Sequence, residues 1–303
     1  MVTGLVSVII PYFNKVNTIE RAVLSVLKQT YSNWEIIIVD DCSSVGLFIR
    51  DEWKKWPIKI FTNKKNIGPG PSRQIGLNNA AGEFIAFLDA DDWWDHSFLM
   101  ASITENVNFP DYAGTWAISE VTYEDRIELR RYSQNNLELI RETILKYPRP
   151  WQTGSILWKK KYCGDWGDLS TNQDYYFELS SSRGNNKLRR IDKVLYFVDQ
   201  TQGNHRTDLV KEFESCTNTF KLFLYFNREY NHALTKHNRI VLFHRILRNL
   251  LKLEEKKLHD TDTIEFWRDF EQRYFLGYLF FRKRILLKVV HSLFQRTIFK
   301  IYF

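Results

Sequence analysis

The sequence predicts an α/β protein with an open, mostly parallel sheet and flanking helices, followed by a helical C-terminal region. In the first part of the 303 residues, short and almost continuous apolar runs alternate with segments of helical periodicity. Such runs are typical of parallel strands buried on both faces. From about Thr207 onward, apolar residues recur at helical spacing with Lys and Arg between them. We therefore expect an α/β domain over residues 1–205 and a helical region over residues 206–303.

Four runs rich in β-branched and aromatic residues are expected strands: Val6–Ile10, Glu35–Asp40, Ile58–Phe61 and Phe84–Leu88. Asn17 and Glu20, between the first two, have the spacing of a capping box at a helix start. A second helix is expected from the Gly/Pro-rich segment 68–71 to Ala80. Further strand-like pieces follow at Tyr112–Ile118, Ser155–Trp158 and Val194–Val198. This alternation of strands and helices favours right-handed crossovers in an open sheet.

Composition excludes several classes of protein. Apolar residues make up 44% and charged residues 26%, which is ordinary for a folded domain and excludes a disordered or fibrous chain. Three cysteines without a CxxC pair argue against a disulfide scaffold or a zinc ribbon. No apolar run reaches the roughly 20 residues that a transmembrane helix needs, and no signal-peptide pattern is visible. We expect a cytoplasmic location.

Positive charge is concentrated at the C-terminal end. Residues 204–303 contain 19 Lys and Arg against 11 Asp and Glu, a net charge of +8, whereas residues 1–203 carry −1. Residues 276–303 interleave apolar side chains with six cations: Arg282, Lys283, Arg284, Lys288, Arg296 and Lys300. A basic amphipathic helix of this kind is typical of peripheral binding to an anionic membrane surface. The alternative is a helical pair packed on the domain with a solvated basic face.

Polar residues follow each of the four expected strands: Pro11-Tyr12-Phe13-Asn14, Asp40-Asp41, Arg73 and Asp89-Ala90-Asp91-Asp92. Ligands of open parallel sheets bind beyond the carboxyl ends of the strands, where the strand order switches. Five carboxylates at one edge would repel each other unless a cation lies among them. Two carboxylates plus ligand phosphates are a usual way of holding Mg²⁺ or Mn²⁺. The Asp89-x-Asp91 spacing therefore predicts a metal–phosphate site.

Four blocks of sequence occur in the order of a known family: VSVIIPYFN (Val6–Asn14), LSVLKQTYSNWEIIIVDDCSS (Leu24–Ser44), NKKNIGPGPSRQIGLNNAAGEFIAFLDADD (Asn63–Asp92) and, more loosely, NQDYYFEL (Asn172–Leu179). The chain resembles the inverting glycosyltransferases of family 2, of the bacterial surface-polysaccharide type. The resemblance implies the GT-A nucleotide-sugar fold and covers about the first two-thirds of the chain.

The resemblance implies a role for each matching residue. The implied nucleotide-sugar contacts are Pro11, Tyr12, Asn14, Asp40, Asp41, Arg73, Asp89 and Ala90. Among these, Asp40 or Asp41 would accept the N–H of uracil, and Asp89 would face the ribose. Asp91, together with Asp89, is the implied ligand of a divalent cation, Mn²⁺ or Mg²⁺.

Asp174 is the implied catalytic base, and the nearby Asp165 and Asp168 are alternative acids for that role. The sequence departs from the family pattern at two positions. Cys42 stands where glycine is common after the Asp pair, and Gln173 stands where glutamate is common before the base. Further candidates for lining the site are His205, Trp93 and Trp151, with core or surface packing as the alternative for each.

The resulting hypothesis is a metal-dependent hexosyl- or N-acetylhexosaminyltransferase. It would move a sugar from a nucleotide-sugar, expected to be a UDP-sugar, to a hydroxyl of a growing, lipid-linked bacterial surface glycan of the O-antigen, capsule or lipopolysaccharide type. We expect it on the inner face of the cytoplasmic membrane. The alternative is a non-catalytic glycan- or nucleic-acid-binding protein on the same fold. Because no RNA- or DNA-reading motif is visible, no nucleic acid partner is expected.

Overall fold

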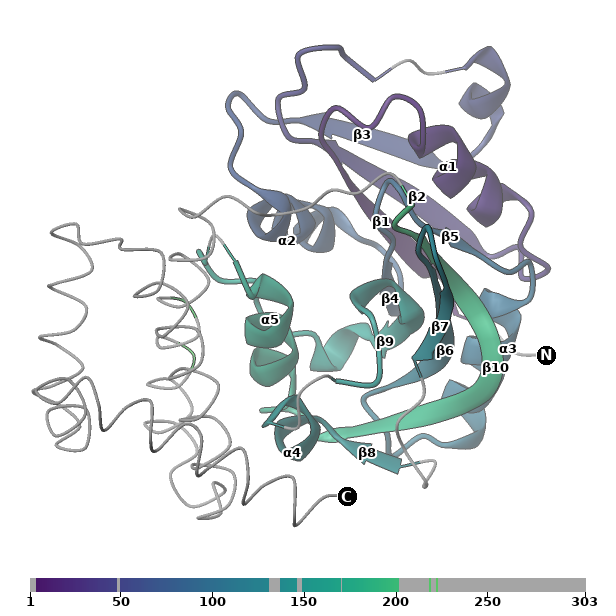
Figure 1. Cartoon of the computed structure of the whole chain (residues 1–303), viewed down its shortest axis with the longest axis vertical. Helices are drawn as coiled ribbons and strands as arrows, with labels where there is room; N and C mark the ends of the chain where they lie inside the picture. The colour runs from purple at the N-terminus through teal and green to yellow at the C-terminus, as the bar shows by residue number, and fades with distance from the viewer. Residues whose placement is uncertain are drawn as a thin grey trace, which may run out of the picture. The chain divides into compact units, whose positions relative to one another are not determined.

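The computed structural model describes residues 4–47, 50–130, 137–145, 149–169 and 171–201, together with Asn218 and Leu222. The chain divides into two compact units, Met1–His205 and Arg206–Phe303. In the described part of the first unit, helices and strands form an α/β domain around one ten-stranded sheet (Figure 1). The predicted helical region over 206–303 lies outside the described residues, apart from two helical positions. No described helix combines the length and the apolar character needed to span a bilayer.

The first half of the sheet is parallel and contains the four predicted strands. Their order is β3 (Ile58–Thr62), β2 (Trp34–Asp40), β1 (Val6–Tyr12) and β4 (Phe84–Phe87). In register, Tyr12 lies opposite Asp40 and Ile9 lies opposite Phe87. Because β2 and β3 lie on one side of β1 and β4 lies on the other, the strand order reverses between β1 and β4. The carboxyl ends of these strands therefore form the edge where a ligand is expected.

The second half of the sheet is mainly antiparallel. Its strands are β5 (Trp93–Trp94), β6 (Gly114–Thr122), β7 (Ile127–Arg130), β8 (Leu137–Leu139), β9 (Ile156–Lys159) and β10 (Lys187–Asp199). β9 is antiparallel to both β4 and β6, whereas β10 is parallel to β6 and antiparallel to β5 and β8. The predicted α/β class is confirmed, with a mixed sheet. Register shifts between Ile191 and Tyr196 bend β10, which curves along the sheet (Figure 1).

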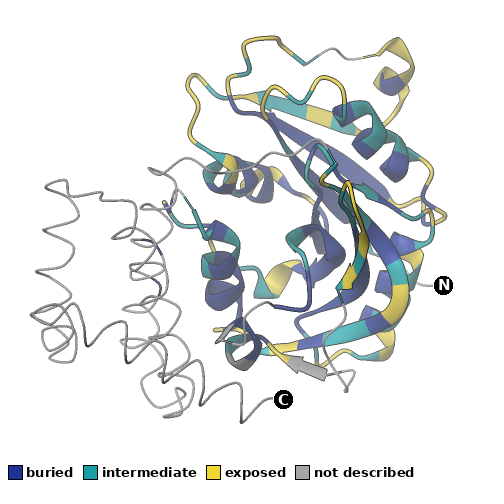
Figure 2. Ribbon diagram, in the orientation of Figure 1, coloured by how far each residue is buried: buried dark blue, intermediate teal, exposed yellow. Residues whose placement is uncertain are grey.

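Helices cover both faces of the sheet, so its centre is fully buried (Figure 2). On one face, α1 (Ile19–Leu27) and α3 (Phe98–Asn108) share a core cluster with alternate residues of β1, β2 and β4. On the other face lie α2 (Pro69–Asn79) and α5 (Gln173–Ser181). A Cβ at Gly76 of α2 would lie 2.3 Å from Ile9 Cγ2, so glycine permits the close approach of α2 to β1. The remaining short helices are η1 (Asp51–Lys55), α4 (Ile140–Leu145), η2 (Thr153–Ser155) and η3 (Lys160–Tyr162).

The predicted capping box at the start of α1 is wrong. Thr18, the residue before the helix, already has helical dihedral angles and makes no side-chain capping hydrogen bond. The Lys15 carbonyl accepts the N–H groups of Thr18 and of the first helical residue. Glu20 pairs with Arg50 instead of reaching back to Asn17. A backbone turn therefore precedes α1 in place of the reciprocal side-chain bonds.

A buried carboxylate joins the parallel strands at the end opposite the candidate site. Glu35, at 5% exposure, accepts hydrogen bonds from Ser7 Oγ (2.6 Å), Lys59 Nζ (2.8 Å) and the Ala81 N–H (2.7 Å). Burial opposes ionisation of Glu35, but these bonds outweigh it and hold the pKa of Glu35 below its ordinary value. One acid thus ties β1, β2, β3 and the segment before β4 together.

Replacing this acid with its neutral isostere is expected to change how stability depends on pH. A lowered pKa contributes stability that is present above the unfolded-state value and is lost as pH falls through the folded value, from about pH 5 downward. Glu35→Gln should therefore cost about 1–2 kcal/mol at pH 7, and the deficit should shrink as the pH falls. Urea unfolding of the variant and the wild type at several pH values between about pH 3 and pH 7 would measure this difference in the free energy of unfolding. The exposed Glu52→Gln is the control; a deficit for Glu35→Gln that does not depend on pH would contradict the assignment.

Candidate active site

The loop after β4 carries the predicted acid pair at the edge where the strand order reverses. Asp89 pairs with Arg73 of α2, and Asp91 lies 2.8 Å from Lys15 Nζ. The two carboxylate side chains are 35% and 37% exposed, whereas Ala90 between them is buried. Both predicted metal ligands therefore reach solvent at this edge, each beside a cation from a different segment.

Asp92 is the buried acid of the same loop. The Tyr196 hydroxyl of β10 donates a hydrogen bond to Asp92 Oδ2. Burial, and then the charges of Asp89 and Asp91, raise the pKa of Asp92 well above its ordinary value. β5 follows directly and pairs with β10, while an Arg21 N–H donates to the Asp91 carbonyl at 2.6 Å. The loop is thus held by β10 as well as by α1.

Cations of the chain itself lie among the acids of this edge, as the expected repulsion between the carboxylates requires. Arg73 and Lys15 pair directly with Asp89 and Asp91. Among the residues that the structure describes, no three His, Cys, Asp or Glu side chains form a ready-made metal cluster. The exposed oxygens of Asp89 and Asp91 nevertheless fit Mg²⁺ or Mn²⁺, because such ions are often held by one or two carboxylates plus substrate phosphates.

The two acids after β2 have different surroundings. Asp41 accepts hydrogen bonds from the N–H groups of residues 67 and 68 (2.9 and 2.7 Å) and from Asn63 Nδ2 (2.9 Å). Asp41 therefore holds the loop that leads into α2. Asp40 accepts the Ser43 N–H at 3.0 Å. Both acids are almost fully buried within these loops.

The segment after β1 lies against the loop after β2. Burial, and then the charge of Asp40, raise the pKa of Tyr12, the last residue of β1. The Asn14 N–H donates to Ser43 Oγ at 3.0 Å, and Asn14 Oδ1 accepts from the N–H and the hydroxyl of Ser44. Cys42 has a φ of 62°, the left-handed region that favours glycine, which explains why glycine is the residue expected there. The predicted residues Tyr12 and Asn14 are therefore brought to the same edge as the paired acids, and Pro11 precedes them in β1.

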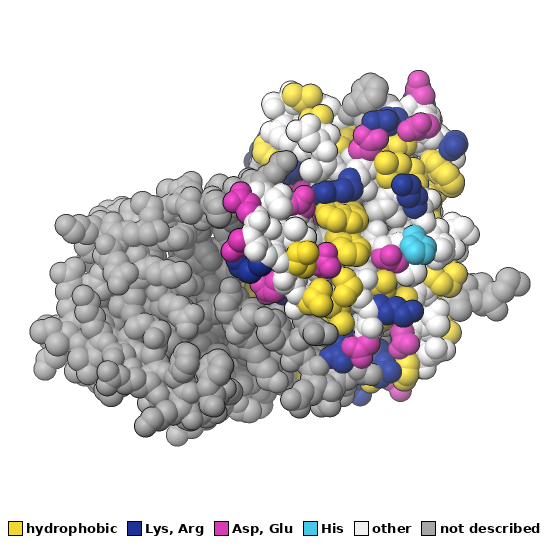
Figure 3. Space-filling model, turned by 45° about the vertical axis from the view of Figure 1, so that its right-hand side comes forward, with side chains coloured by type: hydrophobic (Ala, Val, Ile, Leu, Met, Phe, Trp, Pro, Cys, Tyr) yellow, Lys and Arg dark blue, Asp and Glu magenta, His cyan; other side chains and the backbone are white. Residues whose placement is uncertain are grey.

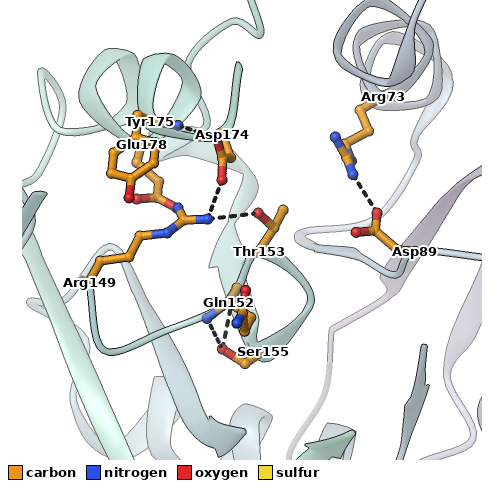
Figure 4. Close-up of polar contacts among 9 residues, drawn as sticks. All are labelled: Arg73, Asp89, Arg149, Gln152, Thr153, Ser155, Asp174, Tyr175 and Glu178. Carbon is orange, nitrogen blue, oxygen red and sulfur yellow. Dashed lines mark hydrogen bonds and ion pairs between the residues drawn. The ribbon is translucent and has the colours of Figure 1, made fainter. Parts of the chain in front are cut away.

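The predicted base, Asp174, lies in the first turn of α5 with its side chain 29% exposed (Figure 4). Its Oδ1 accepts the Tyr175 N–H at 3.0 Å, and its Oδ2 pairs with Arg149. Arg149 also pairs with Glu178 and donates to Thr153 Oγ1 at 3.3 Å. A carboxylate in the first turn is further stabilised by the helix dipole. Asp174 is thus an outward-facing acid with a fixed orientation.

Asp174 and the Asp89 loop lie beside the same helix, α2. Gln173 packs over Gly70 in the first turn of α2, where a Cβ would come within 2.9 Å of its side chain. Arg73, about one turn further along α2, holds Asp89. Figure 4 shows the Asp174 cluster and the Arg73–Asp89 pair in one view. The structure therefore brings the predicted base and the predicted acid pair to the same end of α2.

The aromatic candidates have packing contacts within the protein. Trp151 is 1% exposed and lies against Trp116, with 5.8 Å between ring centroids, so it packs in the core and does not line the edge. The Trp93 ring is stacked on Phe197 at 5.6 Å, and the Arg21 guanidinium lies 3.9 Å from its centroid. His205 lies outside the described residues.

Five side chains of the site were not predicted from the sequence: Lys15, Arg21, Arg149, Glu178 and Tyr196. All five meet their partners across 25 or more positions of the chain, and such contacts leave no periodic signal. Glu178 also follows Asp174 by four residues. That spacing places two side chains on one face of a helix.

Comparisons with known proteins agree with the fold. A family model described as glycosyl transferase family 2 matches residues 7–169. The curated relative WfgD of Escherichia coli, named UDP-Glc:alpha-D-GlcNAc-diphosphoundecaprenol beta-1,3-glucosyltransferase, is 45% identical over 91 residues, which cover 30% of this chain and 36% of WfgD. TuaG of Bacillus subtilis, whose name refers to teichuronic acid biosynthesis, is 43% identical over 93 residues, 30% of this chain and 37% of TuaG. The chain therefore matches little more than a third of the length of these relatives.

Structures of S. aureus TarS 1-349 share the fold. The complex with UDP has a TM-score of 0.51 and 20% identity, over 64% of this chain and 60% of TarS 1-349. The complex with UDP-GlcNAc has a TM-score of 0.53 and 16% identity, over 80% and 81% of the two chains. Similarity at this level of identity shows the fold alone. Because the family model covers more than half of the residues, the chain belongs to glycosyl transferase family 2.

Proposed function

We propose that this chain is an inverting glycosyltransferase that moves a hexosyl or N-acetylhexosaminyl group from a UDP-sugar to a hydroxyl of a lipid-linked bacterial surface glycan. One observation carries the proposal: a partly exposed acid, Asp174, lies beside the same helix as the exposed Asp89-x-Asp91 pair. A transferase of this kind needs a proton acceptor next to a site for the nucleotide diphosphate.

The names of similar proteins support the substrate classes. WfgD is named for a UDP-Glc donor and a diphosphoundecaprenol-linked acceptor, and TuaG for teichuronic acid biosynthesis. TarS has been solved with UDP and with UDP-GlcNAc. A UDP-sugar donor and a polyprenyl-linked acceptor are therefore the first substrates to test.

In the proposed reaction, Asp174 accepts the proton of the acceptor hydroxyl while the hydroxyl oxygen forms a bond to the anomeric carbon. The bond between that carbon and the diphosphate oxygen breaks, and its electron pair leaves with UDP. Because the hydroxyl attacks from the face opposite the nucleotide, an α-linked donor gives a β-linked product. General base help of this kind contributes about 10²- to 10⁴-fold to the rate.

Residues at the strand ends would hold the donor. Asp40 or Asp41 would accept the uracil N–H, and Arg73 would keep Asp89 oriented toward the ribose. Asp91 and Asp89 would hold a divalent cation, Mn²⁺ or Mg²⁺, which when bound supplies positive charge to the leaving diphosphate. Lys15 adds a permanent positive charge beside Asp91 at the same edge.

We propose an anionic membrane surface as the large partner, because the chain has a basic C-terminal region and WfgD is named for a diphosphoundecaprenol-linked acceptor. On the face drawn in Figure 3, Lys and Arg side chains are interspersed with Asp, Glu and apolar side chains, and they form no continuous basic patch. The excess of cations lies in residues 204–303, with a net charge of +8. We propose that this region holds the protein on the inner face of the cytoplasmic membrane, where a lipid-linked acceptor is located.

Removing the base or the metal ligand is expected to abolish sugar transfer. Asp174→Asn keeps the shape of the side chain but cannot accept the proton, so turnover should fall by about 10²- to 10⁴-fold. Asp91→Ala should remove the response to Mn²⁺. The measurement is UDP release from a panel of UDP-sugars with Mn²⁺ or with EDTA. Asp125→Asn, at an exposed ion pair with Arg126, is the matched control; wild-type turnover by Asp174→Asn would refute the assignment of the base.

The two acids after β2 are expected to have different roles: Asp40 contacts the nucleotide base, and Asp41 holds a loop of the protein. A carboxylate that accepts the N–H of uracil should favour UDP over CDP, because cytosine has no N–H at that ring position. Thermal shift with each nucleotide plus Mn²⁺ should show this preference in the wild type and its loss in Asp40→Asn. Asp41→Asn should lower the melting temperature without nucleotide, since Asp41 holds the loop before α2. Equal shifts with UDP and CDP in the wild type would exclude base reading by either acid.

The basic C-terminal region is expected to bind anionic vesicles. Neutralising three adjacent cations in the full-length chain, as Arg282→Gln, Lys283→Gln and Arg284→Gln, should reduce sedimentation with phosphatidylglycerol vesicles roughly 10-fold or more, at about 1 kcal/mol for each charge. Phosphatidylcholine vesicles are the control for charge. Equal sedimentation of both proteins with anionic vesicles would argue for the packed helical pair.

A further inference from the structure

A buried guanidinium lies between two acids of α5. Arg149 is 7% exposed and pairs with both Asp174 and Glu178 (Figure 4). It also donates to Thr153 Oγ1, and its guanidinium carbon lies 4.7 Å from the centroid of the Tyr175 ring. These contacts come from the loop before η2 and from the first two turns of α5, so the position of Arg149 is fixed from several sides.

The two acids differ sharply in their access to solvent. The Asp174 side chain is 29% exposed and that of Glu178 is 2% exposed. Only Asp174 can meet a substrate hydroxyl, whereas Glu178 faces the interior. A single cation therefore joins one outward acid to one inward acid.

The buried members of this cluster shift each other's protonation. Burial alone would lower the pKa of Arg149, but the charges of Asp174 and Glu178 outweigh it and keep Arg149 protonated. Burial raises the pKa of Glu178 to about 7, while the Arg149 charge opposes that rise. Removing one partner of a buried ion pair leaves the other charge uncompensated. A change at Glu178 therefore affects Arg149 directly, and through Arg149 it affects Asp174.

We propose that Arg149 and Glu178 are positioning residues for Asp174. Arg149 orients the Asp174 carboxylate, and Glu178 pairs with Arg149 from its buried side and holds the guanidinium in place. The inference rests on the proposed function, in which Asp174 is the base.

Among the described residues, Arg149 pairs with Asp174 from the loop before η2, and the Tyr175 N–H donates to Asp174 from α5 itself. Glu178 lies four residues further along α5 and pairs with the same guanidinium. Arg149 therefore lies between the two acids of α5.

The acid before the base in the family pattern is replaced here. Gln173 stands at that position and packs over Gly70 at the start of α2. Glu178 provides the acid that shares a cation with Asp174, four residues further along the helix. This arrangement belongs to the residues of this chain.

The test is the pH dependence of turnover of the UDP-sugar that the panel identifies, using the full-length protein. Glu178→Gln removes the carboxylate that pairs with Arg149, so the orientation of Asp174 is less well fixed. At each pH, kcat should fall roughly threefold while the KM for the donor stays unchanged, because only the positioning of the base is affected. Glu105→Gln, which breaks the Arg189–Glu105 pair at the edge of α3, is the matched control.

A double variant keeps the inference testable if Glu178→Gln does not fold. Arg149→Met with Glu178→Leu removes both partners of the buried pair, a change that proteins often tolerate. It should lower kcat by at least 10-fold with an unchanged KM for the donor, because only the base loses its support. Unchanged kcat in the double variant, or in Glu178→Gln, would overturn the inference while leaving the proposed function intact. Turnover by Asp174→Asn would overturn both.

Discussion

Acidic side chains gather at one edge of the sheet, and Asp89 and Asp91 are each paired with a cation from another segment of the chain. Burial, and then the like charges of Asp89 and Asp91, raise the pKa of Asp92 in the same loop. Arg73 from α2 and Lys15 from the segment after β1 balance two of these acids. Because a charge pair fixes two segments relative to each other, the balance of charge also determines the shape of the edge.

The two halves of the sheet contribute differently to this edge. The parallel half supplies the acids, since β2 and β4 both end in aspartates. The second half supplies groups that hold them in place: Tyr196 on β10 donates to Asp92, and β5 pairs with β10 directly after the acid loop. The bend in β10 is therefore part of the site, because it brings that strand to the carboxyl end of β4.

The features that could be predicted from the sequence are those with a local or periodic signal. Four buried parallel strands appear as apolar runs, and Asp40, Asp89 and Asp91 lie at strand ends simply because of chain order. Lys15 and Arg149 could not be predicted, because Lys15 meets Asp91 and Arg149 meets Asp174 only after the chain has folded. The capping box and a site-lining Trp151 failed for a related reason.

In both of those cases the residue type fitted a local role, but the surrounding structure satisfied it in another way. The Lys15 carbonyl already accepts the N–H groups at the start of α1, so no side-chain cap forms. Trp151 is enclosed by the core beside Trp116, so its ring has no open face toward the edge. A local sequence pattern indicates which role a residue could take, and tertiary packing decides whether the residue takes that role.

A base at the surface of a protein has two requirements that oppose each other. It must be held in one orientation, and it must remain open to the substrate hydroxyl. An arginine that is itself held from its buried side by a second acid meets both requirements, provided that the second acid cannot itself reach the substrate. Asp174 and Glu178 satisfy that condition, because they lie on one face of α5 with Arg149 between them and differ in exposure from 29% to 2%. The burial of Glu178, unfavourable on its own, is thus consistent with a role in supporting Asp174.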